Sequence, residues 1–192
     1  MTTPTIIVAG LGRCGTTMLM RMLDAAGMPT IGEAPDWEDM GNTELCERDP
    51  KAWGDTVQGR AVKLLDAHRF NLPDLSGAKL IWLARNPNEQ AKSMLKLVGF
   101  MFSTVTIDRR SVRAMKKSIC RDTTAAVRAL DKAVGSGVGI ALTFEDILKD
   151  PAGAAKVLCE YLDLPTAATE AMAAQVTPRS AACLPYLAEF SA

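Results

Sequence analysis

Short apolar runs alternate along the chain with longer segments in which apolar residues recur every three or four positions. The runs at residues 5–9 and 79–84 contain few polar residues, which is typical of strands buried on both faces of a parallel sheet. Two other runs, at residues 60–65 and 139–144, predict further strands. This alternation predicts an α/β fold in a single domain with a central, mainly parallel β-sheet flanked by helices.

The helical spacing of apolar residues predicts the segments between these strands. Helices are expected over residues 17–26, 110–134 and 151–162, and the alanine-rich remainder is also expected to be helical. The acidic stretch at residues 33–49 is expected to be rich in loops.

A further helix is predicted directly after the apolar run at residues 79–84. Asn86 can cap it, Pro87 suits its first position, and Glu89 follows the cap by three residues as in a capping box. The helix is expected to run to about Val98 and to end at Gly99.

Length and composition narrow the class of protein. A chain of 192 residues suits one domain over residues 1–192, and no apolar run approaches the roughly 20 residues that span a bilayer. The N-terminus lacks the positively charged segment of a signal peptide. The five cysteines are odd in number and widely spaced, which suits neither a disulfide framework nor a zinc site. We therefore expect a reduced, cytoplasmic protein that binds no membrane.

The charges balance overall but not locally. The 22 Lys and Arg residues match 22 Asp and Glu residues, which argues against a generally basic nucleic-acid binder. Residues 1–59 carry a net charge of −5, residues 60–135 one of +9, and residues 136–192 one of −4. The densest basic run consists of Arg109, Arg110, Arg113, Lys116, Lys117 and Arg121. A solvated helix face is the favoured interpretation, and a docking surface for an anionic acceptor or cofactor edge is the alternative.

A glycine-rich turn, residues 10–17, joins the first strand to the first helix. Such a turn aims backbone N–H groups and a helix N-terminus at one point, which favours a phosphate. The turn matches the glycine and threonine positions of G-x-x-x-x-G-K-[ST], but Thr16 replaces the lysine, and Arg13 supplies a cation inside the loop. The alternative is a tight turn whose glycines serve backbone geometry only.

Three blocks of sequence occur in a characteristic order. The first is residues 12–17, the second is residues 83–87 followed by Ser93, and the third is residues 141–151 followed by 158–164. In this order they resemble the 5′-phosphosulfate loop, the 3′-phosphate signature and the closing strand, turn and helix of the sulfotransferase superfamily. The donor of that superfamily is 3′-phosphoadenosine-5′-phosphosulfate (PAPS).

The resemblance implies sulfuryl transfer to a hydroxyl or an amine of a small-molecule or peptide acceptor. The product would be adenosine 3′,5′-bisphosphate (PAP), and no metal is required. Arg13 would neutralise the phosphosulfate, and Arg85 with Ser93 would bind the 3′-phosphate. The implied cofactor-binding residues are Gly12, Arg13, Cys14, Gly15, Thr16, Thr17, Arg85 and Ser93. Cys14 stands where the superfamily usually has serine.

Candidate catalytic groups follow from a finer resemblance to tyrosylprotein-type and related bacterial sulfotransferases. In these, a glutamate soon after the first helix takes the proton from the acceptor, which makes Glu33 the candidate general base. Lys63, at the end of a predicted strand, could stabilise the bridging oxygen as it departs. The lone histidine, His68, is a reserve base, and Arg179 is a further candidate near the nucleotide.

Two rival functions stay open. A P-loop kinase or nucleoside triphosphate hydrolase would use the same turn, although the missing lysine counts against it. A non-catalytic nucleotide-binding module of the same fold is the second rival.

Overall fold

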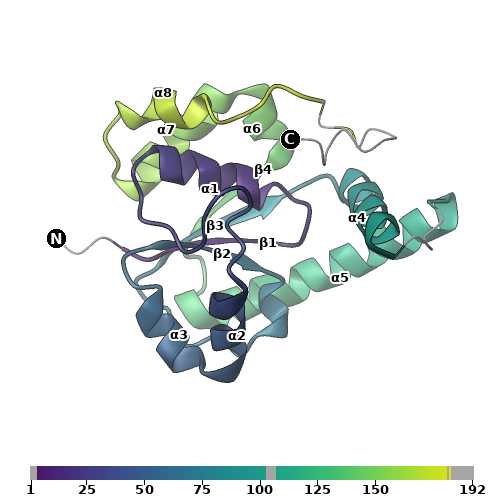
Figure 1. Cartoon of the computed structure of the whole chain (residues 1–192), viewed down its shortest axis with the longest axis horizontal. Coiled ribbons are helices and arrows are strands. Elements are labelled where there is room, and N and C mark those ends of the chain that lie inside the picture. Colours follow the sequence, from purple (N-terminus) through teal and green to yellow (C-terminus); the bar gives the residue numbers. More distant parts are fainter. Residues whose placement is uncertain (1–3, 103–106, 181, 183–192) are drawn as a thin grey trace.

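A four-stranded parallel sheet forms the centre of the computed structural model, which describes residues 4–102, 107–180 and 182. The strands are β1 (Ile6–Gly10), β2 (Ala61–Leu65), β3 (Lys79–Ala84) and β4 (Ile140–Thr143). They lie in the order β2-β1-β3-β4 (Figure 1). Val8 in β1 is in register with Lys63 in β2 and Ile81 in β3. All four predicted strands and the parallel α/β class are confirmed.

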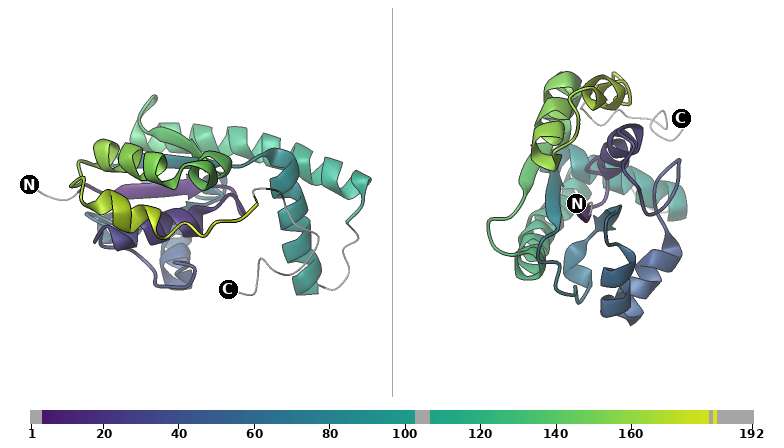
Figure 2. Two further views of the ribbon diagram at one scale, coloured as in Figure 1. Left: turned by 90° about the horizontal axis from the view of Figure 1, so that it is seen from above. Right: turned by 90° about the vertical axis from the view of Figure 1, so that its left-hand side faces the viewer.

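Helices cover both faces of this sheet. They are α1 (Thr16–Ala25), α2 (Met40–Arg48), α3 (Pro50–Thr56), α4 (Pro87–Phe102), α5 (Arg109–Val134), α6 (Phe144–Lys149), α7 (Pro151–Leu162) and α8 (Ala168–Ala173), with a 3-10 turn η1 at Ala67–Arg69. One face carries α1, α6, α7 and α8, and the other carries α2, α3 and α5 (Figures 1 and 2). Within the described residues, no helix is both long and apolar enough to cross a membrane.

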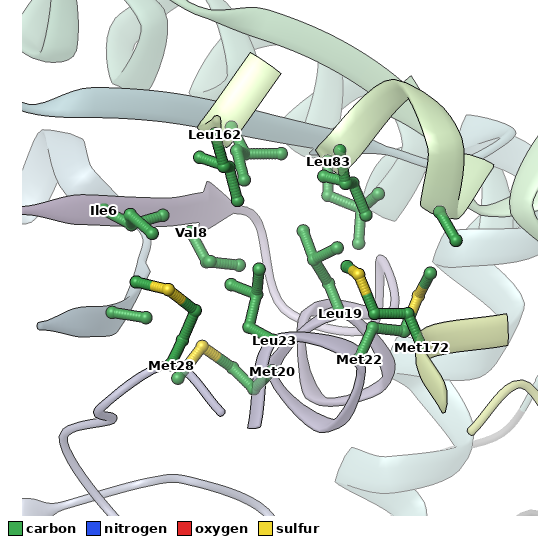
Figure 3. Packing of buried hydrophobic residues seen from close by; sticks show 14 of the residues in the cluster. Ile6, Val8, Leu19, Met20, Met22, Leu23, Met28, Leu83, Leu162 and Met172 are labelled. Carbon is green, nitrogen blue, oxygen red and sulfur yellow. The ribbon is translucent and has the colours of Figure 1, made fainter. Parts of the chain in front are cut away.

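The central strand β1 explains why its sequence is apolar without interruption. Ile6 and Val8 point into one core with α1, α7 and α8, where methionines fill much of the space (Figure 3). Ile7 and Ala9 point into the second core, beneath α3 and α5. Side chains alternate across a strand, so a strand with helices on both faces must be apolar at every position.

The acidic stretch contains helices that the sequence pattern did not predict. Residues 40–48 form α2, which Asp39 caps by accepting a hydrogen bond from the backbone of Asn42 at 2.9 Å, and α3 follows immediately. Each helix buries little of its own surface: Cys46 is the buried residue of α2 and Trp53 that of α3. One anchor per helix leaves too little apolar periodicity to detect.

The helix α4 begins as predicted but continues further. The Asn86 side chain accepts hydrogen bonds from the backbone N–H groups of Asn88 and Glu89, so the predicted cap is confirmed. The second half of the capping box is wrong, because Glu145 rather than Glu89 accepts from the Asn86 N–H, at 3.0 Å. The helix also passes through Gly99, where glycine costs only about 1 kcal/mol relative to alanine.

Candidate active site

The glycine-rich loop is packed tightly between β1, β3 and α6. A Cβ on Gly10 would lie 2.7 Å from the Leu83 carbonyl oxygen, and a Cβ on Gly15 would lie 2.6 Å from the Phe144 ring. Gly15 also has a φ of 101°, which favours glycine. Among the residues that the structure describes, no side chain caps the ten-residue helix α1 that follows. The first turn of α1 therefore presents backbone N–H groups toward the loop, an arrangement that suits a phosphate group.

Side chains just after β3 and on α4 contact this loop. Arg13 donates from Nε to the Ser93 Oγ at 3.1 Å, and Arg85 donates to the Arg13 carbonyl oxygen at 3.2 Å. Gln90 donates to the Gly12 carbonyl oxygen at 2.8 Å. The structure thus brings together the predicted residues of the first and second blocks, which are 72 to 80 positions apart in the chain.

Gln90 is a site residue that the sequence analysis missed. It is 4% exposed and lies on the same side of α4 as Ser93, facing the loop. The only available signal was its position three residues before Ser93 on a predicted helix, which any helix residue could share.

Arg85 is buried at the carboxyl end of β3. It is 6% exposed, and its guanidinium carbon lies 4.5 Å from the centre of the Phe144 ring. The Arg179 guanidinium lies 5.0 Å from the centre of the same ring. Both contacts are cation–π interactions, so Phe144 brings two cations together beside the loop. The sequence named both arginines but gave no reason to connect them through Phe144.

Lys63 extends from β2 to the other side of the loop. Its Nζ donates to the Thr17 Oγ1 at 3.0 Å, to the Asp36 carbonyl oxygen at 2.9 Å and to the Glu38 Oε1 at 2.7 Å. The Lys63 side chain is 3% exposed. The predicted catalytic lysine therefore lies against the first turn of α1.

Neither predicted base lies against this lysine. Glu33 is exposed on the segment between α1 and α2, and its carbonyl oxygen accepts from the Trp37 N–H. His68 lies in η1, which packs against α5. There, a hydrogen bond from Arg121 and, as a smaller contribution, the charge of His68 lower the pKa of Asp122. The roles of Glu33 and His68 stay predictions.

Cys14 fills the position where serine is usual in the superfamily, and its thiol is buried. It is 1% exposed, and its sulfur lies where a Cβ on Gly10 would stand. Burial raises the pKa of this thiol to about 12, although backbone hydrogen bonds from Thr16 and Cys14 itself act in the opposite direction. A thiol that stays protonated is no nucleophile, so Cys14 serves as a small apolar filler beneath the loop.

The basic run of α5 lies beside an open cavity of about 750 Å³ between α4 and α5. Its charged lining consists of Lys92, Asp108, Arg109, Arg113 and Lys116. A smaller cavity of about 250 Å³ at the end of β3 is lined by Leu11, Arg85 and Gln90, among others. The larger cavity thus shares none of its lining with the loop, whereas the smaller one does.

Comparison with known proteins identifies the family of this chain. Residues 72–168, about half of the chain, match the sequence profile of the sulfotransferase family. The protein belongs to that family. Membership of this family supports sulfuryl transfer as the reaction, and the kinase or hydrolase alternative is not favoured. No curated protein matches the sequence significantly.

Solved structures give the same fold at low identity. A sulfotransferase from Mycobacterium avium is 16% identical with a TM-score of 0.55, and the match covers 90% of this chain and 67% of that one. A mouse sulfotransferase complexed with PAP is 16% identical with a TM-score of 0.62, covering 90% and 63%. One from Alicyclobacillus acidocaldarius is 18% identical with a TM-score of 0.51, covering 85% and 82%. The chain is therefore shorter than each of these relatives.

Proposed function

We propose that the protein transfers a sulfuryl group from PAPS to a hydroxyl or an amine of a small-molecule or peptide acceptor. The observation that carries the proposal is the contact of Arg85 and Ser93 with Arg13 in the loop. The loop leads into α1, whose N-terminus no side chain of the described residues caps. Structures of related proteins support it: a mouse sulfotransferase is complexed with PAP, and a retinol dehydratase is in complex with androsterone and PAP.

The residues of the loop suit both anionic ends of this donor. Backbone N–H groups at Gly15, Thr16 and Thr17, together with the Arg13 guanidinium, would hold the 5′-phosphosulfate. Arg85 and Ser93 would hold the 3′-phosphate. The donor itself supplies the sulfuryl group and leaves as PAP.

The chain's own side chains then meet the remaining demands of group transfer. Lys63, held against Thr17, places a positive charge where negative charge grows on the departing phosphate. Glu33, exposed on its loop, would accept the proton of the acceptor hydroxyl. We propose no metal, because cations and N–H dipoles supply the charge stabilisation.

Thermal unfolding in the presence of nucleotides tests the proposal. PAP should raise the melting temperature well above the effect of ADP or of ATP with magnesium, because a ligand that binds only the folded state stabilises it. Stabilisation by ATP and not by PAP would overturn the proposal in favour of a kinase or hydrolase.

Substitution of Arg85 tests its assignment to the 3′-phosphate. Arg85→Ala should weaken PAP binding about 100-fold and leave the binding of adenosine 5′-monophosphate, which lacks that phosphate, within about threefold. Equal losses for the two nucleotides would remove Arg85 as the 3′-phosphate ligand. Tight PAP binding without transfer to any of a broad panel of acceptors would favour a non-catalytic module.

The remaining expectations stay part of the proposal. We propose that residues 1–192 form one domain and that the protein acts in the cytoplasm, as its cysteine content predicts. Fractionation of cells that express the tagged protein would test its location.

A further inference from the structure

The segment between α1 and α2 is fixed in place by one buried tryptophan. Trp37 is 6% exposed, packs into the same core as α1, and has a φ of 55°, which is uncommon outside glycine. The turn closes tightly, since a Cβ on Gly32 would lie 2.8 Å from the Trp37 carbonyl group. A bridge between Thr30 and Ala61 fixes its start. Strained backbone of this kind is typical of functional segments.

The residues on either side of Trp37 both reach the ammonium group of Lys63. Asp36 contributes its carbonyl oxygen and Glu38 its carboxylate, while Thr17 contributes a hydroxyl. A lysine ammonium has three N–H donors, so all three are used. A further anion can therefore bind Lys63 only by displacing one of these partners.

Glu38 is the partner that can leave. Its side chain is 52% exposed, against 3% for Lys63. The Asp36 carbonyl is fixed by the buried Trp37, and Thr17 by the first turn of α1. An anion at the N-terminus of α1 would also repel the Glu38 carboxylate across a few ångströms.

We propose that Glu38 is an internal counter-ion of Lys63, which holds the lysine beside the loop and is displaced when the anionic cofactor binds. The inference rests on the proposed function, because it takes the incoming anion to be the phosphosulfate end of PAPS. Glu38 is then a positioning residue, and it lowers the affinity for the cofactor because part of the binding free energy is used to break the ion pair.

The test is isothermal titration of the protein with PAP. Glu38→Gln should tighten binding about three- to tenfold, because the neutral amide competes less well for Lys63. A merely structural role would weaken binding instead. Glu44→Gln is the matched control: Glu44 is an exposed acid on α2, and its loss should change the affinity less than twofold.

The same substitution in a Lys63→Ala variant shows whether Glu38 acts through its ion pair with Lys63 or only through its charge. In that background, Glu38→Gln should have no further effect on PAP binding. Unchanged or weaker binding by Glu38→Gln, or equal tightening with and without Lys63, would overturn the proposal. Should Glu38→Gln fold poorly by circular dichroism, Glu38→Ala gives the same comparison.

The same titrations distinguish the two proposals. If the wild type does not bind PAP, or if Arg85→Ala does not weaken it, the proposed function fails and the counter-ion proposal fails with it. If the wild type binds PAP through Arg85 but Glu38→Gln does not tighten binding, only the role of Glu38 is overturned.

Discussion

Two groups of cations in this protein differ in almost everything except their charge. Lys63 lies in the middle of β2, not at the end of a strand as expected from the sequence, and Arg85 directly follows β3. Both side chains are almost fully buried and donate hydrogen bonds to segments far away in the chain. Arg109, Arg113 and Lys116 lie exposed on one side of α5, beside an open cavity. A buried cation needs fixed partners to offset its desolvation, whereas an exposed one needs none. The cations of the candidate active site are therefore distinguished from those of α5 by burial and fixed partners, and not by the number of charges.

The cysteines repeat this contrast and give the largest expected effect. At pH 8, iodoacetamide should modify the buried Cys14 of the loop about a thousandfold more slowly than the exposed Cys120 of α5. The reason is that burial raises the pKa of Cys14 from 9.0 to about 12, which lowers its thiolate fraction in proportion. Peptide mass spectrometry measures both rates, and similar rates would contradict the tight packing of the loop.

The same pKa has a consequence for stability. Because the thiol pKa is higher in the folded protein, Cys14 contributes its full stability below pH 9, and this contribution is lost as the pH rises from 9 to about 12.

The second prediction concerns the glycines of the same two regions. Gly15→Ala should lower the free energy of unfolding by about 2–4 kcal/mol, because it combines a positive φ with a clash against Phe144. Gly137→Ala, in the turn after α5, has a φ of 76° but open space around it, and should cost only about 1 kcal/mol. Urea denaturation measures both values, and equal costs would show that packing on Phe144 is unimportant.

The third prediction compares arginines by a conservative change. Arg85→Lys should weaken PAP binding about tenfold, because a single ammonium cannot both contact the Phe144 ring and reach the Arg13 carbonyl oxygen as the guanidinium does. Arg113→Lys should leave the affinity unchanged. Calorimetric titration gives both constants, and a tolerated lysine at position 85 would show that charge alone suffices there.

The smallest effect is expected where the charge is densest. Replacing Arg109, Arg113 and Lys116 together by glutamine should weaken PAP binding less than about twofold at physiological salt, because exposed charges are screened over about 8 Å. A loss above tenfold would revive the alternative that this face of α5 docks the edge of the cofactor. Measurement at two salt concentrations distinguishes a direct contact from a long-range field.

The residues near the loop show how far the sequence could predict the site. Arg13, Arg85 and Ser93 were identified because a motif fixes their spacing, and the structure brings all three together. Gln90 and Glu38 were not identified as site residues, because no local pattern distinguishes a buried glutamine on a helix or one acid in an acidic run. Their roles come from contacts across 25 and 78 positions of sequence.

The strands, the glycine-rich turn and the cap of α4 could be predicted from the sequence, because apolar runs, positive-φ positions and caps are local requirements of the backbone. Three pairings became known only from the fold: Glu145 completes the cap of α4, the Phe144 ring contacts two arginines, and Glu38 is the acid that binds Lys63. Such pairings join residues that are far apart in the chain, so they depend on how whole elements pack against one another.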